Sequence, residues 1–349
     1  MWMAAPVLLA MPACGDDDGG NDAGGEIEEA VETVDDGSAD ADQADVEPET
    51  PEEAAADADG DGDADAEAGD DAPVVSCDEL GEGTNEGFLV DTEPRAFFLD
   101  LPADVETGGP WPVVFNYHGL GDTAENMRNL LSSDVDNTVL PFILVTPEDT
   151  NFALGGLMNI DWDVATVTAD NREARMFDAV LECLESRWGV DDAHVHAVGF
   201  SMGGFLVDAL GTVRGERLAS VVTYSGGYGS NPANLSGFLA SLVSWPEYTT
   251  ANDYVQVFLH GGTTDTYNLT VQTLHFDQMA ANDAVWLNGF GHDVVVCDHG
   301  GGHTVPFSFR GEQVVRFFAD HPLGTVDSPY ASGLPVEFPG DCTFQGGAK

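Results

Sequence analysis

The amino-acid sequence predicts an α/β fold, with a mainly parallel central sheet flanked by helices and preceded by a disordered acidic linker. Two observations predict it. Between residues 77 and 322, short β-rich runs alternate with helical stretches, which is typical of parallel strands joined by helices. Before residue 75 the chain carries no basic residue, since its first Arg is Arg95 and its single Lys is Lys349. We therefore expect one folded domain over residues 75–349, of ordinary size for a single core.

The first 74 residues divide into two segments. Residues 15–74 contain 25 Asp or Glu and no Lys or Arg, so they have too little apolar surface to offset the entropy of ordering. Residues 1–14 contain an apolar run too short to span a bilayer, ending in small residues before Cys14. This start resembles a bacterial lipoprotein signal, although the usual basic residues are missing. The resemblance implies lipidation of Cys14 and an extracellular or cell-envelope location.

Charge and cysteine content narrow the possible partners. The formal net charge of −53 argues against nucleic acid and against anionic membranes, so we expect membrane contact only through the lipid anchor. Apart from Cys14, the chain has four cysteines, an even number that permits two disulfides in three connectivities. Four buried free thiols are the alternative. These residues are Cys77, Cys183, Cys297 and Cys342.

The expected elements follow one another along the folded part. We expect a capping box of Asp170 and Glu173 at the start of the first long helix, and Gly189 at its end. The tail, residues 323–349, has no clear periodicity and is expected to be irregular. The predicted strands are 96–102, 111–121, 141–149, 193–201, 218–227, 254–262 and 293–303, and the predicted helices are 171–189, one from about Met202, 269–283 and 309–320.

One serine, in the sequence "VHAVGFSMGGFLVDAL", marks a change from strand-like to helix-like pattern. Ser201 lies there between Gly199 and Gly203. A sharp turn at this place leaves no room for side chains at the two glycines and exposes the serine Oγ at a helix N-terminus. The free amides and the dipole of that terminus favour a developing negative charge. The pattern indicates a catalytic nucleophile, and a purely structural glycine turn is the alternative.

The motif "GFSMGG" and its surroundings resemble the α/β-hydrolase superfamily. Within it, the chain is similar to exported esterases grouped with polyhydroxybutyrate depolymerases, feruloyl esterases and acetyl xylan esterases. The similarity runs over most of residues 90–320, through "VVFNYHGLGDTAENM", "RWGVDDAHVHAVGFSMGG", "FLHGGTTD" and "WLNGFGHDVVVCDHGGGHTVP". The resemblance implies a serine nucleophile that is followed in the chain by an acid and then by a histidine.

Asp265 and His303 fit that order. A serine hydroxyl needs a base, and the base needs an acid that fixes its tautomer. His303 stands in "GGGHTVP" after an apolar run, and Asp265 follows a buried run that ends in glycines. The rivals for the base are His292 and His299; those for the acid are Asp277 and Asp283, which we expect to be helical and solvated.

Other residues complete the predicted site. The backbone amides of Met202 and Leu120 are expected to hold the oxyanion, with His118 more structural than catalytic. Trp162 lies where the resembling esterases place pocket aromatics, and core packing is its alternative. The sequence has no HExxH, no paired cysteine spacing of the zinc type and no nucleotide-binding motif, so we expect no metal and no cofactor.

The sequence thus predicts a monomeric serine carboxylic-ester hydrolase that acts through Ser201, His303 and Asp265 and an acyl-enzyme. The expected substrates are feruloyl, acetyl-polysaccharide or hydroxyalkanoate-type polyester esters. A serine peptidase of the same superfamily is one alternative, because amides and esters share the acylation chemistry. A surface binding protein that retains the fold without catalysis is the other.

Overall fold

The computed structural model describes residues 76–154, 158–249, 254–269 and 272–348. The predicted signal segment 1–14, with Cys14, and the predicted linker 15–74 lie outside the described residues. Among the described residues, no helix is both long enough and apolar enough to span a bilayer.

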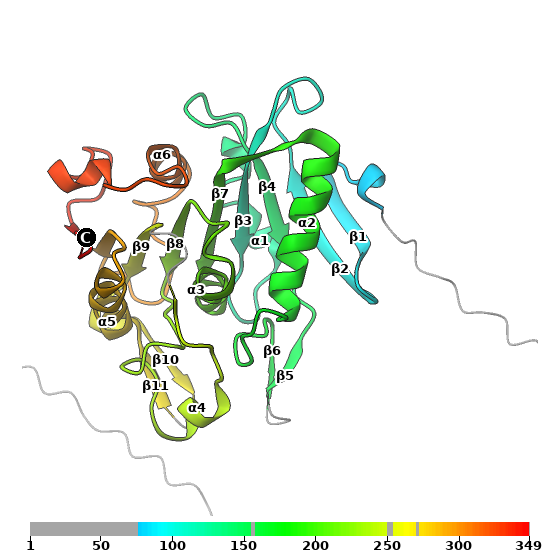
Figure 1. Cartoon of the computed structure of the whole chain (residues 1–349). Coiled ribbons are helices and arrows are strands. Elements are labelled where there is room, and N and C mark those ends of the chain that lie inside the picture. The colour runs from blue at the N-terminus through cyan, green and yellow to red at the C-terminus, as the bar shows by residue number, and fades with distance from the viewer. Residues whose placement is uncertain (1–75, 155–157, 250–253, 270–271, 349) are drawn as a thin grey trace, which may run out of the picture. The chain divides into compact units, whose positions relative to one another are not determined.

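A nine-stranded sheet forms the centre of the domain (Figure 1). Its six central strands, from β4 to β12, run parallel, and antiparallel strands close both edges. The predicted α/β fold with a mainly parallel sheet is therefore confirmed. In spatial order the strands are β1 (Gly83–Val90), β2 (Glu93–Asp100), β4 (Ile143–Pro147), β3 (Trp111–Tyr117), β7 (Val190–Phe200), β8 (Ser220–Tyr224), β9 (Val255–His260), β12 (Val294–Asp298) and β13 (Cys342–Gln345).

Helices cover both faces of the sheet, so the central strands β3, β4, β8 and β9 are buried along their whole length. In β3, Phe115 packs with Phe177 of α2 on one face, whereas Val114 belongs to the apolar cluster on the other. One face carries α2 (Arg172–Trp188), α3 (Met202–Arg214) and α5 (Phe276–Gly289), which lie in front of the sheet in Figure 1; the other carries α1 (Ala124–Arg128) and α6 (Glu312–Asp320).

Smaller elements lie beyond the carboxyl ends of the parallel strands (Figure 1). They are two hairpins and one short helix, namely β5 (Phe152–Leu154) with β6 (Met158–Ile160), β10 (Thr266–Leu269) with β11 (Gln272–His275), and α4 (Gly237–Leu242).

Three local expectations are wrong. Residues 269–283 do not form one helix, because β11 pairs with β10 and α5 begins only at Phe276. The cap of α2 is Asn171, whose side chain accepts hydrogen bonds from the amides of Glu173 and Ala174, and not Asp170. Its predicted end at Gly189, with φ of 77°, is confirmed. The tail 323–349 is not wholly irregular, since β13 adds an edge strand to the sheet.

The four cysteines of the folded part form two disulfides. Cys77 pairs with Cys183 of α2, 106 residues away, and Cys297 of β12 pairs with Cys342 of β13, 45 residues away. The first disulfide ties the start of the described chain to a long helix, and the second ties the tail to the sheet.

Removal of the longer cross-link is expected to destabilise the domain strongly. The double variant Cys77→Ala/Cys183→Ala frees a loop of 106 residues in the unfolded chain, which lowers the free energy of unfolding by roughly 2–5 kcal/mol. Urea unfolding of the oxidised proteins measures it, with Cys297→Ala/Cys342→Ala as the matched variant for the shorter loop. A stability equal to that of the wild type would contradict this cross-link.

Candidate active site

Three of the predicted site residues follow neighbouring parallel strands. Ser201 comes directly after β7, Asp265 follows β9, and His303 follows β12. Because β7, β8, β9 and β12 are adjacent and parallel, their carboxyl ends meet at one edge of the sheet, where ligands of α/β proteins bind. The fold thus brings together side chains that are up to 102 residues apart in the sequence.

The three side chains form one chain of hydrogen bonds. The Nε2 atom of His303 lies 2.9 Å from Oγ of Ser201, and its Nδ1 atom lies 2.7 Å from Oδ1 of Asp265. A carboxylate only accepts, so Nδ1 carries the hydrogen and Nε2 presents its lone pair to the serine hydroxyl. This is the arrangement in which a serine can be deprotonated as it attacks.

Asp265 is fully buried yet well supplied with donors. Its second oxygen, Oδ2, accepts hydrogen bonds from the hydroxyl of Ser225 at 2.7 Å and from the amide of Gly261 at 2.8 Å. Burial raises the pKa of Asp265, but the hydrogen bonds from His303, Gly261 and Ser225 outweigh it, so the pKa is lowered. The lowered pKa favours the ionised form of Asp265 beside the imidazole of His303.

The backbone at Ser201 is strained. Its φ of 54° and ψ of −114° are unusual for any residue with a side chain. A Cβ atom on Gly199 would overlap the carbonyl oxygen of Gly203, and one on Gly203 would overlap the carbonyl oxygen of Tyr117. The two glycines thus let the turn between β7 and α3 pack directly on the end of β3.

Two aromatic rings fix the orientation of the His303 imidazole. The ring of Phe276 stacks on it at 4.8 Å between centroids, and that of Phe200 lies 4.9 Å away. The rival His292 is buried elsewhere, where it binds the hydroxyl of Tyr248 at 2.7 Å. His299 lies in the loop after β12, and burial lowers its pKa.

The predicted oxyanion donors lie on two segments that meet at Ser201. Met202 is the first residue of α3, where amides have no intrahelical acceptor. Leu120 belongs to the turn after β3, and a Cβ on the neighbouring Gly119 would stand 3.2 Å from Cβ of Ser201. The amide of Gly121 donates to Asp161 at 2.6 Å and so holds this turn from its far side.

Trp162 is placed differently from its predicted position in the pocket. Its side chain is wholly buried in the core, packs edge-on against Tyr117 and donates from Nε1 to the carbonyl oxygen of His118 at 2.9 Å. It therefore supports the backbone that leads into the turn at Leu120 and has no surface left for a ligand.

An apolar cavity of about 420 Å³ is lined by Met202, the residue that follows Ser201, and by Phe205 of the same helix α3. Leu239 of α4, Trp245 and Tyr267 of β10 are further lining residues. The cavity could not be predicted from sequence, because its lining residues come from distant segments, among them α4 and the β10–β11 hairpin.

The sequence did not reveal the supporting roles of two further polar residues. Ser225, with φ of 50°, holds Asp265 from the loop after β8. Asp283, expected to be solvated, is fully buried on α5 and accepts hydrogen bonds from the amide of Tyr228 and the side chains of Asn231 and Asn234. The other rival acid, Asp277, is only partly buried and lies at the first turn of the same helix.

One group of side chains in the described part of the chain has the geometry of a cation site. It consists of His118 and the successive residues Glu148 and Asp149, whose ligand atoms lie within 4.8 Å of one another.

The strain at Ser201 predicts an unusual order of stabilities. Glycine adopts positive φ at little cost, so Ser201→Gly is expected to be more stable than Ser201→Ala by about 1 kcal/mol or more. Both variants lack the hydroxyl group, so the difference reports the backbone alone. Urea unfolding measures it.

Ser133 serves as the control for that comparison, because it is exposed and lies in a 3-10 helix without positive φ. There Ser133→Gly is expected to be less stable than Ser133→Ala by about 0.5–1 kcal/mol. The same order at both positions would refute the strained turn.

The buried carboxyl of Asp283 predicts a pH-dependent stability. Burial raises its pKa from 3.8 to about 7, although three hydrogen-bond donors oppose this. Between pH 4 and 7 the folded chain keeps a proton that the unfolded chain releases, so the contribution of Asp283 to the free energy of unfolding falls as the pH rises. The slope is at most about 1.4 kcal/mol per pH unit.

Urea unfolding from pH 4.5 to 7.5 tests this. Asp283→Asn, which cannot titrate, should show a smaller decrease in unfolding free energy than the wild type. Asp277→Asn, on the same helix, should follow the wild-type curve. Parallel curves for Asp283→Asn and the wild type would exclude the raised pKa.

Known proteins resemble this chain in part. No family model matches it. It is 24% identical over 203 residues to feruloyl esterase D of Neurospora crassa, which covers 56% of this chain and 62% of that protein. It is 28% identical over 137 residues to the probable feruloyl esterase C of Aspergillus niger, which covers 38% of this chain and 47% of that protein. The chain thus spans less than two thirds of the length of these relatives.

The fold has a solved counterpart. The native structure of pOPH superposes with a TM-score of 0.59 at 17% sequence identity and covers 77% of this chain and 95% of its own. This likeness concerns the fold, whereas the sequence matches point to feruloyl esterases. The predicted resemblance is confirmed: the chain has the α/β-hydrolase fold and is similar to esterases of that fold.

Proposed function

We propose that the protein is a serine carboxylic-ester hydrolase with Ser201 as nucleophile, His303 as general base and acid, and Asp265 as the residue that orients the histidine. The hydrogen-bonded chain from Ser201 through His303 to Asp265 carries this proposal. The partial identity with feruloyl esterases supports the reaction class.

The geometry accounts for each step. Nε2 of His303 takes the proton from Oγ of Ser201 as the oxygen attacks the ester carbonyl, and the amides of Met202 and Leu120 hold the resulting oxyanion. The tetrahedral intermediate collapses to an acyl-enzyme, and His303 returns the proton to the departing alcohol. Water, deprotonated by His303, then attacks the acyl-enzyme. The second tetrahedral intermediate collapses, the acid is released, and His303 returns the proton to Oγ of Ser201.

The apolar cavity beside Met202 supports esters with an apolar acyl or aromatic group as substrates. Trp245 and Tyr267 are aromatic residues of its lining. We therefore propose feruloyl esters as the first candidate substrates, with acetyl-polysaccharide and hydroxyalkanoate-type esters as the others.

We also propose that the protein acts outside the cytoplasm. Its two disulfides are typical of an oxidising compartment. Attachment to a membrane through a lipid on Cys14 is part of this proposal, and mass spectrometry of the N-terminal peptide from a membrane fraction tests it.

The activity is tested with purified wild type and two variants. We expect the wild type to hydrolyse p-nitrophenyl butyrate and methyl ferulate. The kcat should be lowered about 10⁴-fold or more in Ser201→Ala, which lacks the nucleophile. It should be lowered about 10⁴-fold in Asp265→Asn, because the amide favours the wrong tautomer of the imidazole. Acetylated xylan and hydroxybutyrate oligomers complete the substrate screen.

A fluorophosphonate probe separates the alternatives. Labelling of the wild type and of Ser133→Ala, but not of Ser201→Ala, is the expected result. A wild type that is not labelled and hydrolyses no ester would favour a binding protein with this fold. Cleavage of peptide p-nitroanilides in preference to esters would favour a peptidase.

A further inference from the structure

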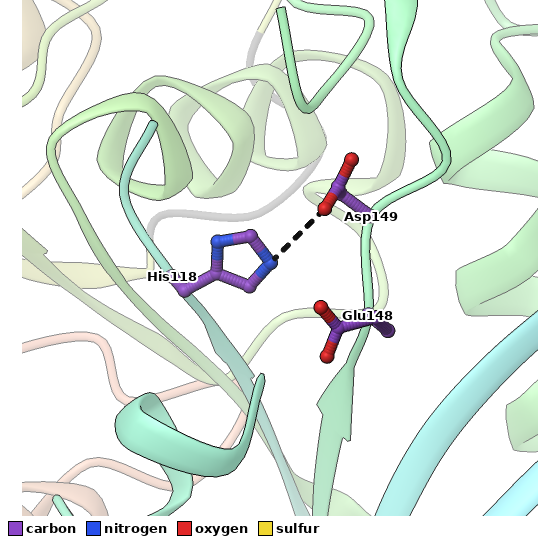
Figure 2. Close-up of side chains that lie close together, drawn as sticks. All are labelled: His118, Glu148 and Asp149. Atoms are coloured by element: carbon purple, nitrogen blue, oxygen red, sulfur yellow. Dashed lines mark ion pairs between the residues drawn. The ribbon is translucent and has the colours of Figure 1, made fainter. Parts of the chain in front are cut away.

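We propose that the end of β4 and the turn after β3 form a binding site for one divalent transition-metal ion, Zn²⁺ or Mn²⁺, with His118, Glu148 and Asp149 as ligands. The three residues follow two adjacent parallel strands, so the fold brings them together from positions 30 residues apart in the sequence. Figure 2 shows the imidazole edge of His118 facing both carboxylates.

The buried imidazole of His118 is the main evidence for this metal site. The side chain is fully buried, and its Nε2 atom has no hydrogen-bond partner. Nδ1 lies 2.9 Å from the carbonyl oxygen of Gly119, which only accepts, so Nδ1 carries the hydrogen. In the neutral ring Nε2 then presents a lone pair, which is the tautomer that binds metals, with its other nitrogen fixed by a backbone carbonyl.

Backbone groups also orient the two carboxylates. Glu148 accepts a hydrogen bond at Oε2 from the amide of Ala124, at the start of α1, and Asp149 accepts one at Oδ2 from the amide of Asn151. Each therefore keeps its other oxygen for a ligand. The free Oδ1 of Asp149 lies 3.9 Å from Nε2 of His118, too far for a hydrogen bond.

These distances suit a small cation. Two metal–ligand bonds of about 2.1 Å allow ligand atoms to stand up to roughly 4.2 Å apart. The observed ligand atoms lie within 4.8 Å of one another, and both carboxylates are partly exposed, so a slight side-chain rotation closes the remaining gap. The half-open side leaves room for water as the further ligand.

The charges around His118 also favour a bound cation. A cation between them would stabilise a lone pair on buried Nε2 that faces two carboxylates. A third carboxylate, Asp161, has an oxygen 3.9 Å from Nδ1 of the same ring. Among the described residues, no Arg side chain forms an ion pair with Glu148, Asp149 or Asp161. The imidazole nitrogen favours Zn²⁺ over Ca²⁺ and Mg²⁺, which prefer oxygen ligands alone, and the two carboxylates also suit Mn²⁺.

The test measures metal binding and does not depend on the proposed hydrolase activity. The full chain is stripped with a chelator, dialysed and titrated with Zn²⁺ by calorimetry and with Mn²⁺ by electron paramagnetic resonance. We expect one tight equivalent and a higher unfolding temperature with metal. The numerous acidic residues of the chain bind metal ions weakly in every variant. The measured quantity is therefore the affinity of the single tightly bound metal ion.

Variants assign the ligands. Glu148→Gln and Asp149→Asn retain an oxygen for the amides that they bind and should weaken the tight equivalent at least tenfold. Asp298→Asn is the matched control, because it removes a carboxylate 3.8 Å from the ring nitrogen of another buried histidine, His260. It should bind as the wild type does.

A spin-echo measurement on the Mn²⁺ complex tests for the histidine ligand without a substitution at His118, through coupling to one imidazole nitrogen in the wild type. The proposal is overturned if the stripped wild type has no tight equivalent, if tight binding persists in both carboxylate variants, if Asp298→Asn abolishes it, or if the nitrogen coupling is absent. Tight binding of Ca²⁺ in place of Zn²⁺ or Mn²⁺ also contradicts it.

Discussion

The direct packing of two backbone segments at Ser201 is the constraint on which the rest of the site depends. The turn from β7 into α3 presses Gly203 against the carbonyl oxygens of Tyr117 and His118, at the end of β3. This contact leaves no room for a Cβ, and it places Ser201 beside the turn at Leu120. The positive φ of Ser201 costs on the order of 1–3 kcal/mol and persists only because strand and helix on either side are firmly packed.

A buried polar network supports the site from behind. Asp208 of α3 accepts hydrogen bonds from Thr223 of β8 at 2.7 Å and from Gln256 of β9 at 2.6 Å. Gln256 in turn accepts from the hydroxyl of Tyr228 at 2.7 Å. Burial raises the pKa of Asp208 well above its ordinary value. Polar groups in such a place are costly unless they are satisfied, so the network fixes one arrangement of these three elements.

The same network reaches the acid of the site. Asp283 binds the amide of Tyr228 and so holds the loop that follows β8. That loop begins at Ser225, whose hydroxyl binds Asp265. Contacts thus lead from a carboxyl group on α5, through the loop after β8, to the residue that binds the His303 imidazole.

Sequence patterns predicted what is local and left open what depends on distant contacts. The glycines around Ser201 and the apolar runs of the central strands are local signals, and they predicted the sheet and the positions of Ser201, Asp265 and His303 at its edge. Residues 269–283 looked helical throughout, but pairing between β10 and β11 overrides propensity in the first half. The burial of Asp283 and Trp162 and the pairing of the four cysteines follow from packing that no short segment encodes.

The turn at Leu120 lies between two different restraints because of the order of the strands. β3 has β7 on one side and β4 on the other, so the turn after β3 faces Ser201 on one side and Glu148 and Asp149 on the other. On the first side, packing on Gly203 excludes any movement toward α3. On the second side, two carboxylates lie near Nε2 of His118, which has no hydrogen-bond partner. The turn itself therefore separates Ser201 from this pair of carboxylates.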